Sequence, residues 1–157
     1  MNRIAILVCI AAVALSSCHK DPRVSAINEI VFGTYYNNCG GTCFHIYRID
    51  NNKIQKDTSV QYFGSYRDFV FSPDRTLTQA QYNSVQHLID DVPDDMLNIT
   101  TKVYGCPDCY DQGGVYVSIT RNGANTRYLL DTKGSPDEPA TYKAYREKIM
   151  AAIEQLP

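Results

Sequence analysis

The sequence predicts an α+β domain: an antiparallel sheet of about five strands with two helices packed on one face. Two observations support this fold class. Alternating apolar and polar residues, typical of half-buried strands, occur in runs that are joined by short turns rich in Asn, Asp and Gly. Apolar residues at helical intervals follow these runs twice, which gives the element order β-β-β-α-β-β-α.

The first half of the domain is expected to contain three strands. The first covers residues 26–35, and the second covers residues 44–50, where the alternation is clear. Residues 50–53 (Asp-Asn-Asn-Lys) predict a turn, because Asn and Asp tolerate the left-handed backbone. Residues 54–63 are therefore expected to return as the second arm of a hairpin, and residues 66–71 are a candidate for one further short strand.

The first helix is expected after Leu77. Thr78 is a candidate N-cap, and Gln81, three residues later, would complete a capping box. Apolar residues continue at helical spacing as far as Val92, and Pro93 marks the end of the pattern.

The second half of the chain predicts a hairpin and a closing helix. Residues 115–120 alternate strongly, residues 121–124 (Arg-Asn-Gly-Ala) form a turn, and residues 126–130 pair back. The closing helix is expected to begin near Pro139, with one apolar face that continues to Leu156.

The N-terminal residues resemble a bacterial lipoprotein signal. Arg3 precedes an apolar run over residues 4–15, and Ser16 and Ser17 stand directly before Cys18. A basic start, about a dozen apolar residues and small residues at a cleavage site are typical of an export signal. A cysteine directly after the small residues makes the segment resemble the lipobox, which implies cleavage before Cys18, diacylglycerol on its thiol and acylation of the new N terminus.

We therefore expect a signal peptide over residues 1–17, a flexible tether over residues 18–25 and a single α+β domain over residues 26–157. The apolar run is too short for a spanning helix, which needs about 20 residues. An ordinary signal peptide with a chance cysteine is the alternative. The expected location is the bacterial cell envelope, where acyl chains on Cys18 hold the protein to a membrane, with the outer membrane favoured and the face left open.

Charge argues against nucleic acid as a partner. The formal net charge of the 157 residues is −2, and loss of Arg3 with the signal lowers it to −3. The sequence contains no block of Lys and Arg, which nucleic acids and anionic headgroups require. Apart from the membrane, the expected partner is an envelope protein or a glycan.

Four cysteines remain after the signal and Cys18: Cys39, Cys43, Cys106 and Cys109. Disulfides are the default outside the cytoplasm. Four cysteines allow three connectivities, and we favour the two local pairs, Cys39–Cys43 and Cys106–Cys109. Each local bridge is expected to contribute about 2 kcal/mol, so these bridges would shape loops more than hold the fold together.

Two other interpretations of these cysteines stay open. Four thiolates could bind zinc tetrahedrally, although export into an oxidising compartment counts against a metal site. Cys106 and Cys109 could instead catalyse thiol–disulfide exchange, for which a helix N-terminus normally lowers the thiol pKa. The residues at positions 110–114 are poor helix formers, and a strand is expected after them.

We find no catalytic constellation in the sequence and expect no metal and no cofactor. His19, His45 and His87 are scattered, and no Ser/His/Asp or Cys/His set has a recognisable spacing. The leading hypothesis is a lipid-anchored, non-catalytic binding or interaction module of the cell envelope. The alternative is an envelope thiol–disulfide oxidoreductase that uses Cys106 and Cys109.

The expected contact surface is a sheet face or loop that contains Tyr35, Tyr36, Tyr104 and Tyr110. The paired glycines of residues 113–114 further indicate a backbone with positive φ or a close approach to another segment.

The order of these features resembles a group of lipidated envelope proteins of Gram-negative bacteria. The features are a Cys-x3-Cys before a hairpin, a capped helix, the residues Asp-Gln-Gly-Gly-Val-Tyr and a closing helix. The similarity covers most of residues 26–156. That group has no established activity, so the resemblance implies a location and no mechanism, and no functional residue is carried over from it.

Overall fold

The structure, a computed structural model, describes residues 27–36, 43–59, 69–98 and 101–157. The predictions for the signal peptide, for the tether with Cys18, and for Cys39 lie outside these residues. None of the helices in the described ranges has the length and apolar character that crossing a membrane requires.

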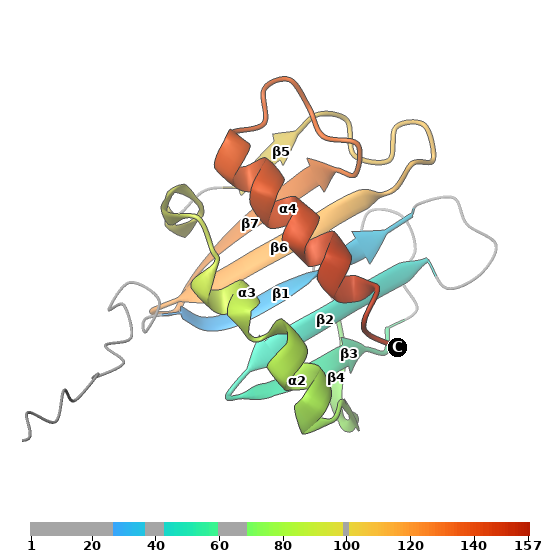
Figure 1. Cartoon of the computed structure of the whole chain (residues 1–157), viewed down its shortest axis with the longest axis vertical. Coiled ribbons are helices and arrows are strands. Elements are labelled where there is room, and N and C mark those ends of the chain that lie inside the picture. The colour runs from blue at the N-terminus through green and yellow to red at the C-terminus, as the bar shows by residue number, and fades with distance from the viewer. Residues whose placement is uncertain (1–26, 37–42, 60–68, 99–100) are drawn as a thin grey trace, which may run out of the picture.

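Within the described residues, one mixed sheet has the strand order β4-β3-β2-β1-β6-β7-β5 (Figure 1). Its strands are β1 (Ile27–Tyr35), β2 (Phe44–Asp50), β3 (Lys53–Asp57), β4 (Phe71–Thr76), β5 (Thr101–Tyr104), β6 (Gly114–Arg121) and β7 (Ala124–Asp131). The helices are α2 (Gln79–Val85), α3 (His87–Asp90), the short 3-10 helix η1 (Asp94–Leu97) and α4 (Ala140–Ile153). The predicted α+β class is confirmed.

Helices α2, α3 and α4 lie on the same face of the sheet, the front in Figure 1. Their apolar sides pack on alternate residues of the strands, so Ile30 and Phe32 of the central strand β1 are fully buried. The buried hydroxyl of Tyr145 on α4 donates a hydrogen bond of 2.9 Å to the carbonyl oxygen of Leu88 on α3. This bond joins the two helical segments above the main core.

The opposite face of the sheet carries a second apolar cluster, which we call the rear cluster. Its buried members are Val31, Tyr35, Ile46 and Tyr116, against which Phe44, Phe69, Phe71 and Leu129 pack. The ring of Phe69 meets that of Tyr116 edge-on at 5.0 Å. The central strands are therefore buried on both faces, which explains why Ile30, Val31 and Phe32 of β1 are consecutive apolar residues.

The prediction of about five antiparallel strands is wrong in number and in direction. The sheet of the described residues has seven strands, and β5 pairs with β7 in parallel. Sequence patterns missed β5 because this edge strand is short and its first three residues are exposed, so no apolar alternation marks it. β4 begins where the predicted strand over residues 66–71 was expected to end. It contains Pro73, which an edge strand tolerates because one side of its backbone needs no ladder partner.

The predicted termini of several elements are confirmed. β2 covers the predicted residues 44–50, and Thr78 and Gln81 form the expected capping box at the start of α2. Asn122 and Gly123 have φ values of 51° and 78°, as the turn between β6 and β7 requires. The predicted single helix is instead divided at Gln86 into α2 and α3.

Buried tyrosine hydroxyls predict a loss of stability in alkaline solution. Burial raises the pKa of Tyr47 to about 12 and also raises the pKa of Tyr145. From about pH 10 to pH 12 the unfolded chain would release these protons while the folded chain keeps them, so the free energy of unfolding should fall as pH rises. Denaturant unfolding at a series of pH values measures this slope.

The variant Tyr47→Phe should flatten the alkaline slope, because it removes one of the titrating groups. Tyr110→Phe is the matched control, since the side chain of Tyr110 is exposed. If the alkaline fall in the free energy of unfolding is unchanged in Tyr47→Phe, the hydroxyl of Tyr47 is not one of the groups that cause it.

Candidate functional site

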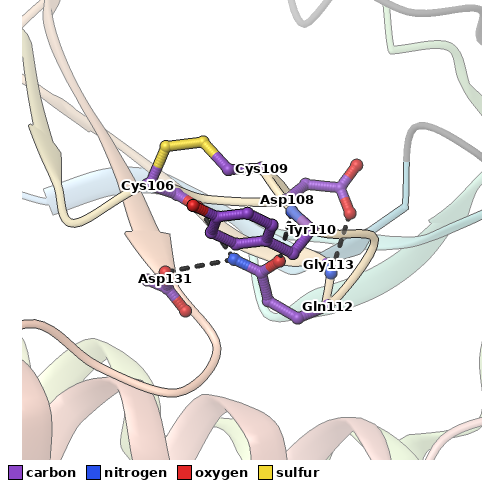
Figure 2. The surroundings of a disulfide bond; sticks show 7 residues. All are labelled: Cys106, Asp108, Cys109, Tyr110, Gln112, Gly113 and Asp131. Carbon is purple, nitrogen blue, oxygen red and sulfur yellow. Dashed lines mark hydrogen bonds between the residues drawn. A yellow bond between two sulfur atoms is a disulfide. The ribbon is translucent and has the colours of Figure 1, made fainter.

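The candidate site is the loop of residues 105–113, which joins β5 to β6 (Figure 2). It lies at the end of the sheet where β1 ends, because Gly114 pairs with Tyr35. Ile27, at the other end of β1, pairs with Arg121. The loop and the first described residue are therefore separated by the length of β1.

A disulfide between Cys106 and Cys109 closes a tight turn in this loop (Figure 2). The two Cα atoms are 5.5 Å apart, and the backbone N–H of Cys109 donates a hydrogen bond of 3.1 Å to the carbonyl oxygen of Cys106. This is the local pairing that we favoured from the sequence. Cys43 is also disulfide-bonded; its predicted partner, Cys39, lies outside the described residues.

Asp108 holds the base of the loop. Its side chain is buried, and its Oδ1 accepts a hydrogen bond of 2.8 Å from the backbone N–H of Gly113. The backbone N–H of Asp108 in turn donates to the carbonyl oxygen of Gly113 at 3.2 Å. Asp108 adopts a left-handed backbone with φ of 62°, a conformation that Asp tolerates better than most residues.

Gln112 ties both sides of the loop together and to the sheet. Its Oε1 accepts from the backbone N–H of Tyr110 at 2.8 Å, while its Nε2 donates to the carbonyl oxygen of Cys106 at 2.8 Å. The same Nε2 also donates to Oδ2 of Asp131, the last residue of β7, at 3.2 Å. Figure 2 shows the Gln112 amide within the loop, between the disulfide turn and β7.

Tyr110 is the side chain that this framework presents to solvent. It is 87% exposed, although its backbone N–H is held by Gln112. Cys106 and Cys109 are also exposed, so an aromatic ring and a disulfide share the outer surface of the loop. The hydrogen bonds of Asp108 and Gln112 thus hold the backbone of a loop whose outer surface carries the Tyr110 ring.

The expected close approach at the paired glycines is confirmed. Gly113 has φ of 78°, and a Cβ at this position would collide with the ring of Tyr36. A Cβ on Gly114 would collide with the ring of Tyr35. The glycines therefore let the loop lie against the end of β1.

The hypothesis of a contact surface made of four tyrosines is wrong. Tyr35 is 1% exposed and belongs to the rear cluster, and Tyr36 is half-buried. Tyr104 is half-buried on the helical side, where its ring meets that of Tyr142 edge-on at 5.4 Å. Of the four, Tyr110 alone is largely exposed.

The surroundings of Cys106 and Cys109 do not favour a reactive thiol. Strand β6, and not a helix, follows the pair along the chain, whereas a reactive Cys-x2-Cys normally stands at the N-terminus of a helix that lowers the thiol pKa. The carboxyl group between them, Asp108, would disfavour a thiolate. Both cysteines are in a disulfide, which leaves no thiolate of this pair for zinc, and no group of three or more potential metal ligands occurs in the described part of the chain.

Sequence reasoning missed the roles of Asp108 and Gln112. The spacing of Asp108 from Gly113 is a weak local signal, since Asp side chains often bond to nearby backbone in turns. The role of Gln112 has no local signal, because the fold brings Asp131 of β7 to its amide.

Comparisons of the chain with protein-family models, with curated proteins and with solved structures find no match. No relative therefore supplies a role for the loop, and its chemistry must be judged from its own residues.

Removing the Cys106–Cys109 disulfide should weaken the fold only slightly. In the double variant Cys106→Ser, Cys109→Ser the free energy of unfolding should fall by about 2 kcal/mol, because a four-residue loop constrains the unfolded chain little. Urea unfolding followed by circular dichroism measures the change, with Tyr110→Ala as an exposed-site control. Failure of the double variant to fold would contradict the local role of the bridge.

Proposed function

We propose that this protein is a lipid-anchored, non-catalytic binding module of the bacterial cell envelope, and that Tyr110 is its main contact residue. The observation that carries the proposal is the exposure of Tyr110 on a loop closed by a disulfide and braced by Asp108 and Gln112. Tyrosine is among the residues that dominate binding energy at protein interfaces. A loop ordered in advance loses little conformational entropy when a partner binds.

The surface of the loop favours a protein as its partner. The ring of Tyr110 and the exposed Cys106–Cys109 disulfide are apolar, the polar groups of Gln112 are already bonded within the protein, and Asp111 beside Tyr110 is exposed. An aromatic ring with a carboxylate at its rim suits a pocket on another protein. We therefore propose an envelope protein as the partner of the loop.

The proposed anchor at Cys18 precedes the end of β1 that lies opposite the loop. Cys18 precedes Ile27, the first residue of β1, by a short polar stretch, whereas the loop lies at the far end of that strand. A nine-residue strand is about 26 Å long from its first to its last Cα. An anchor before β1 would leave Tyr110 at the end of the domain farther from the lipid.

Photo-crosslinking tests the proposed contact. A photoreactive phenylalanine analogue placed at position 110 should give a discrete adduct with an envelope protein in living cells. The same analogue at Asn83, an exposed position on α2, is the control and should not give that adduct. Identical adducts from both positions, or none from position 110, would contradict the proposal.

The variant Cys18→Ser tests the anchor. It should lose its acyl chains and accumulate as a soluble envelope protein or an uncleaved precursor, because the thiol is the proposed site of lipidation. Its folded domain should unfold at the same denaturant concentration as the lipidated protein. Membrane fractionation and mass spectrometry measure these outcomes; membrane partitioning that persists after signal removal would overturn the lipobox interpretation.

A further inference from the structure

A hollow of about 430 Å³ lies at the other end of the sheet from the Tyr110 loop. It is formed by the start of β1, the turn between β2 and β3, and the α2–α3 segment. Figure 1 shows these three parts at one side of the molecule, away from the β5–β6 connection. The volume lies within the range of about 300–1,000 Å³ that is usual for ligand pockets.

The side chains that line the hollow include polar groups that have no hydrogen-bond partner among the described residues. Asp50, Asn51, Gln86 and Asp90 line it, and their side chains make no hydrogen bond to any other described residue. Gln86 and Asp90 come from the helical side, while Asp50 is the last residue of β2 and Asn51 begins the turn after it. Two carboxylates and two amides thus face one space with their polar atoms available.

Two further amides in the hollow are held in position. Asn52 Oδ1 accepts a hydrogen bond of 3.2 Å from the hydroxyl of Tyr82. Asn28 Oδ1 accepts one of 2.8 Å from the backbone N–H of Asn122. Both bonds use the oxygen, so the amide nitrogen of each side chain stays available as a donor. Orienting these amides in advance lowers the entropy cost of ligand binding.

The remaining lining is apolar. Ile49 and Tyr82 are buried beneath the polar groups, and Ile89 on α3 is half-buried beside them. The hollow therefore presents a ring of amides and carboxylates, and its accessible apolar side chains are the half-buried Ile27 and Ile89. Among the described residues no Lys or Arg lines it, and its two carboxylates would repel an anionic ligand.

We propose that this hollow binds a saccharide that carries no acidic group. A sugar presents many hydroxyls, each a donor and an acceptor, and carboxylates and amides can pair with adjacent hydroxyls. The C–H face of a pyranose ring is apolar and can contact the half-buried side chains of Ile27 and Ile89. The site is separate from the Tyr110 loop and does not depend on it.

The test uses the full-length lipidated protein in a detergent without a sugar headgroup. An array of neutral, amino-bearing and acidic oligosaccharides is screened, and the best non-acidic oligosaccharide is titrated into the protein. The variants Gln86→Leu and Asp90→Ala should each raise the dissociation constant about tenfold, because each removes a hydrogen-bonding group from the hollow. Both residues are exposed and unbonded, so both variants should fold normally.

Gln79→Leu is the matched control, since it makes the same change at an exposed position at the start of α2, outside the hollow, where it loses only a local hydrogen bond to Asn83. Its dissociation constant should stay within about twofold of that of the unmodified protein, as should that of Tyr110→Ala. Binding of acidic oligosaccharides only, the absence of any binding, or unchanged affinity in both hollow variants would overturn the proposal.

Discussion

The structure depends on the burial of β1 on both of its faces. This strand lies at the centre of the sheet, between β2 and β6. Ile30 and Phe32 face the helices, while Val31 and Tyr35 face the rear cluster, and each is at most 7% exposed. Burial of one such side chain contributes about 2 kcal/mol, and β1 contributes buried side chains to both apolar clusters.

The burial of β1 on both faces also determines where polar residues and irregular loops can lie next to this strand. A strand buried on both faces leaves only its two ends accessible to solvent. The Tyr110 loop lies at one end, where Gly113 and Gly114 allow it to pack against Tyr35 and Tyr36. The hollow lined by Gln86 and the Asn-rich turn lies at the other end. The two proposed binding surfaces therefore lie at opposite ends of β1.

The sequence predicted those parts of the fold whose signals are local. The capping box at Thr78 and the turn at Asn122 depend on neighbouring residues, and both are present. β5 could not be predicted in the same way, because its place beside β7 depends on parallel pairing at a sheet edge and its residues are largely exposed. The prediction of a contact surface made of four tyrosines failed for a related reason. Tyr35 and Tyr110 have similar side chains, and only the tertiary fold shows that one is buried and the other exposed.

The Tyr110 loop is also connected to the interior through a buried charge. Arg146 on α4 is 4% exposed and forms an ion pair of 3.0 Å with Glu138. It also donates a hydrogen bond of 2.9 Å to the carbonyl oxygen of Thr132, whose hydroxyl donates at 2.8 Å to the carbonyl oxygen of Gln112.

Leaving one member of a buried ion pair without its partner typically costs about 3–5 kcal/mol, so Arg146 and Glu138 hold each other firmly. The hydrogen bonds that hold the loop therefore continue from Gln112 through Thr132 to Arg146 of the closing helix α4. This connection gives a physical reason why an exposed tyrosine can be held on a rigid support at the edge of a small domain.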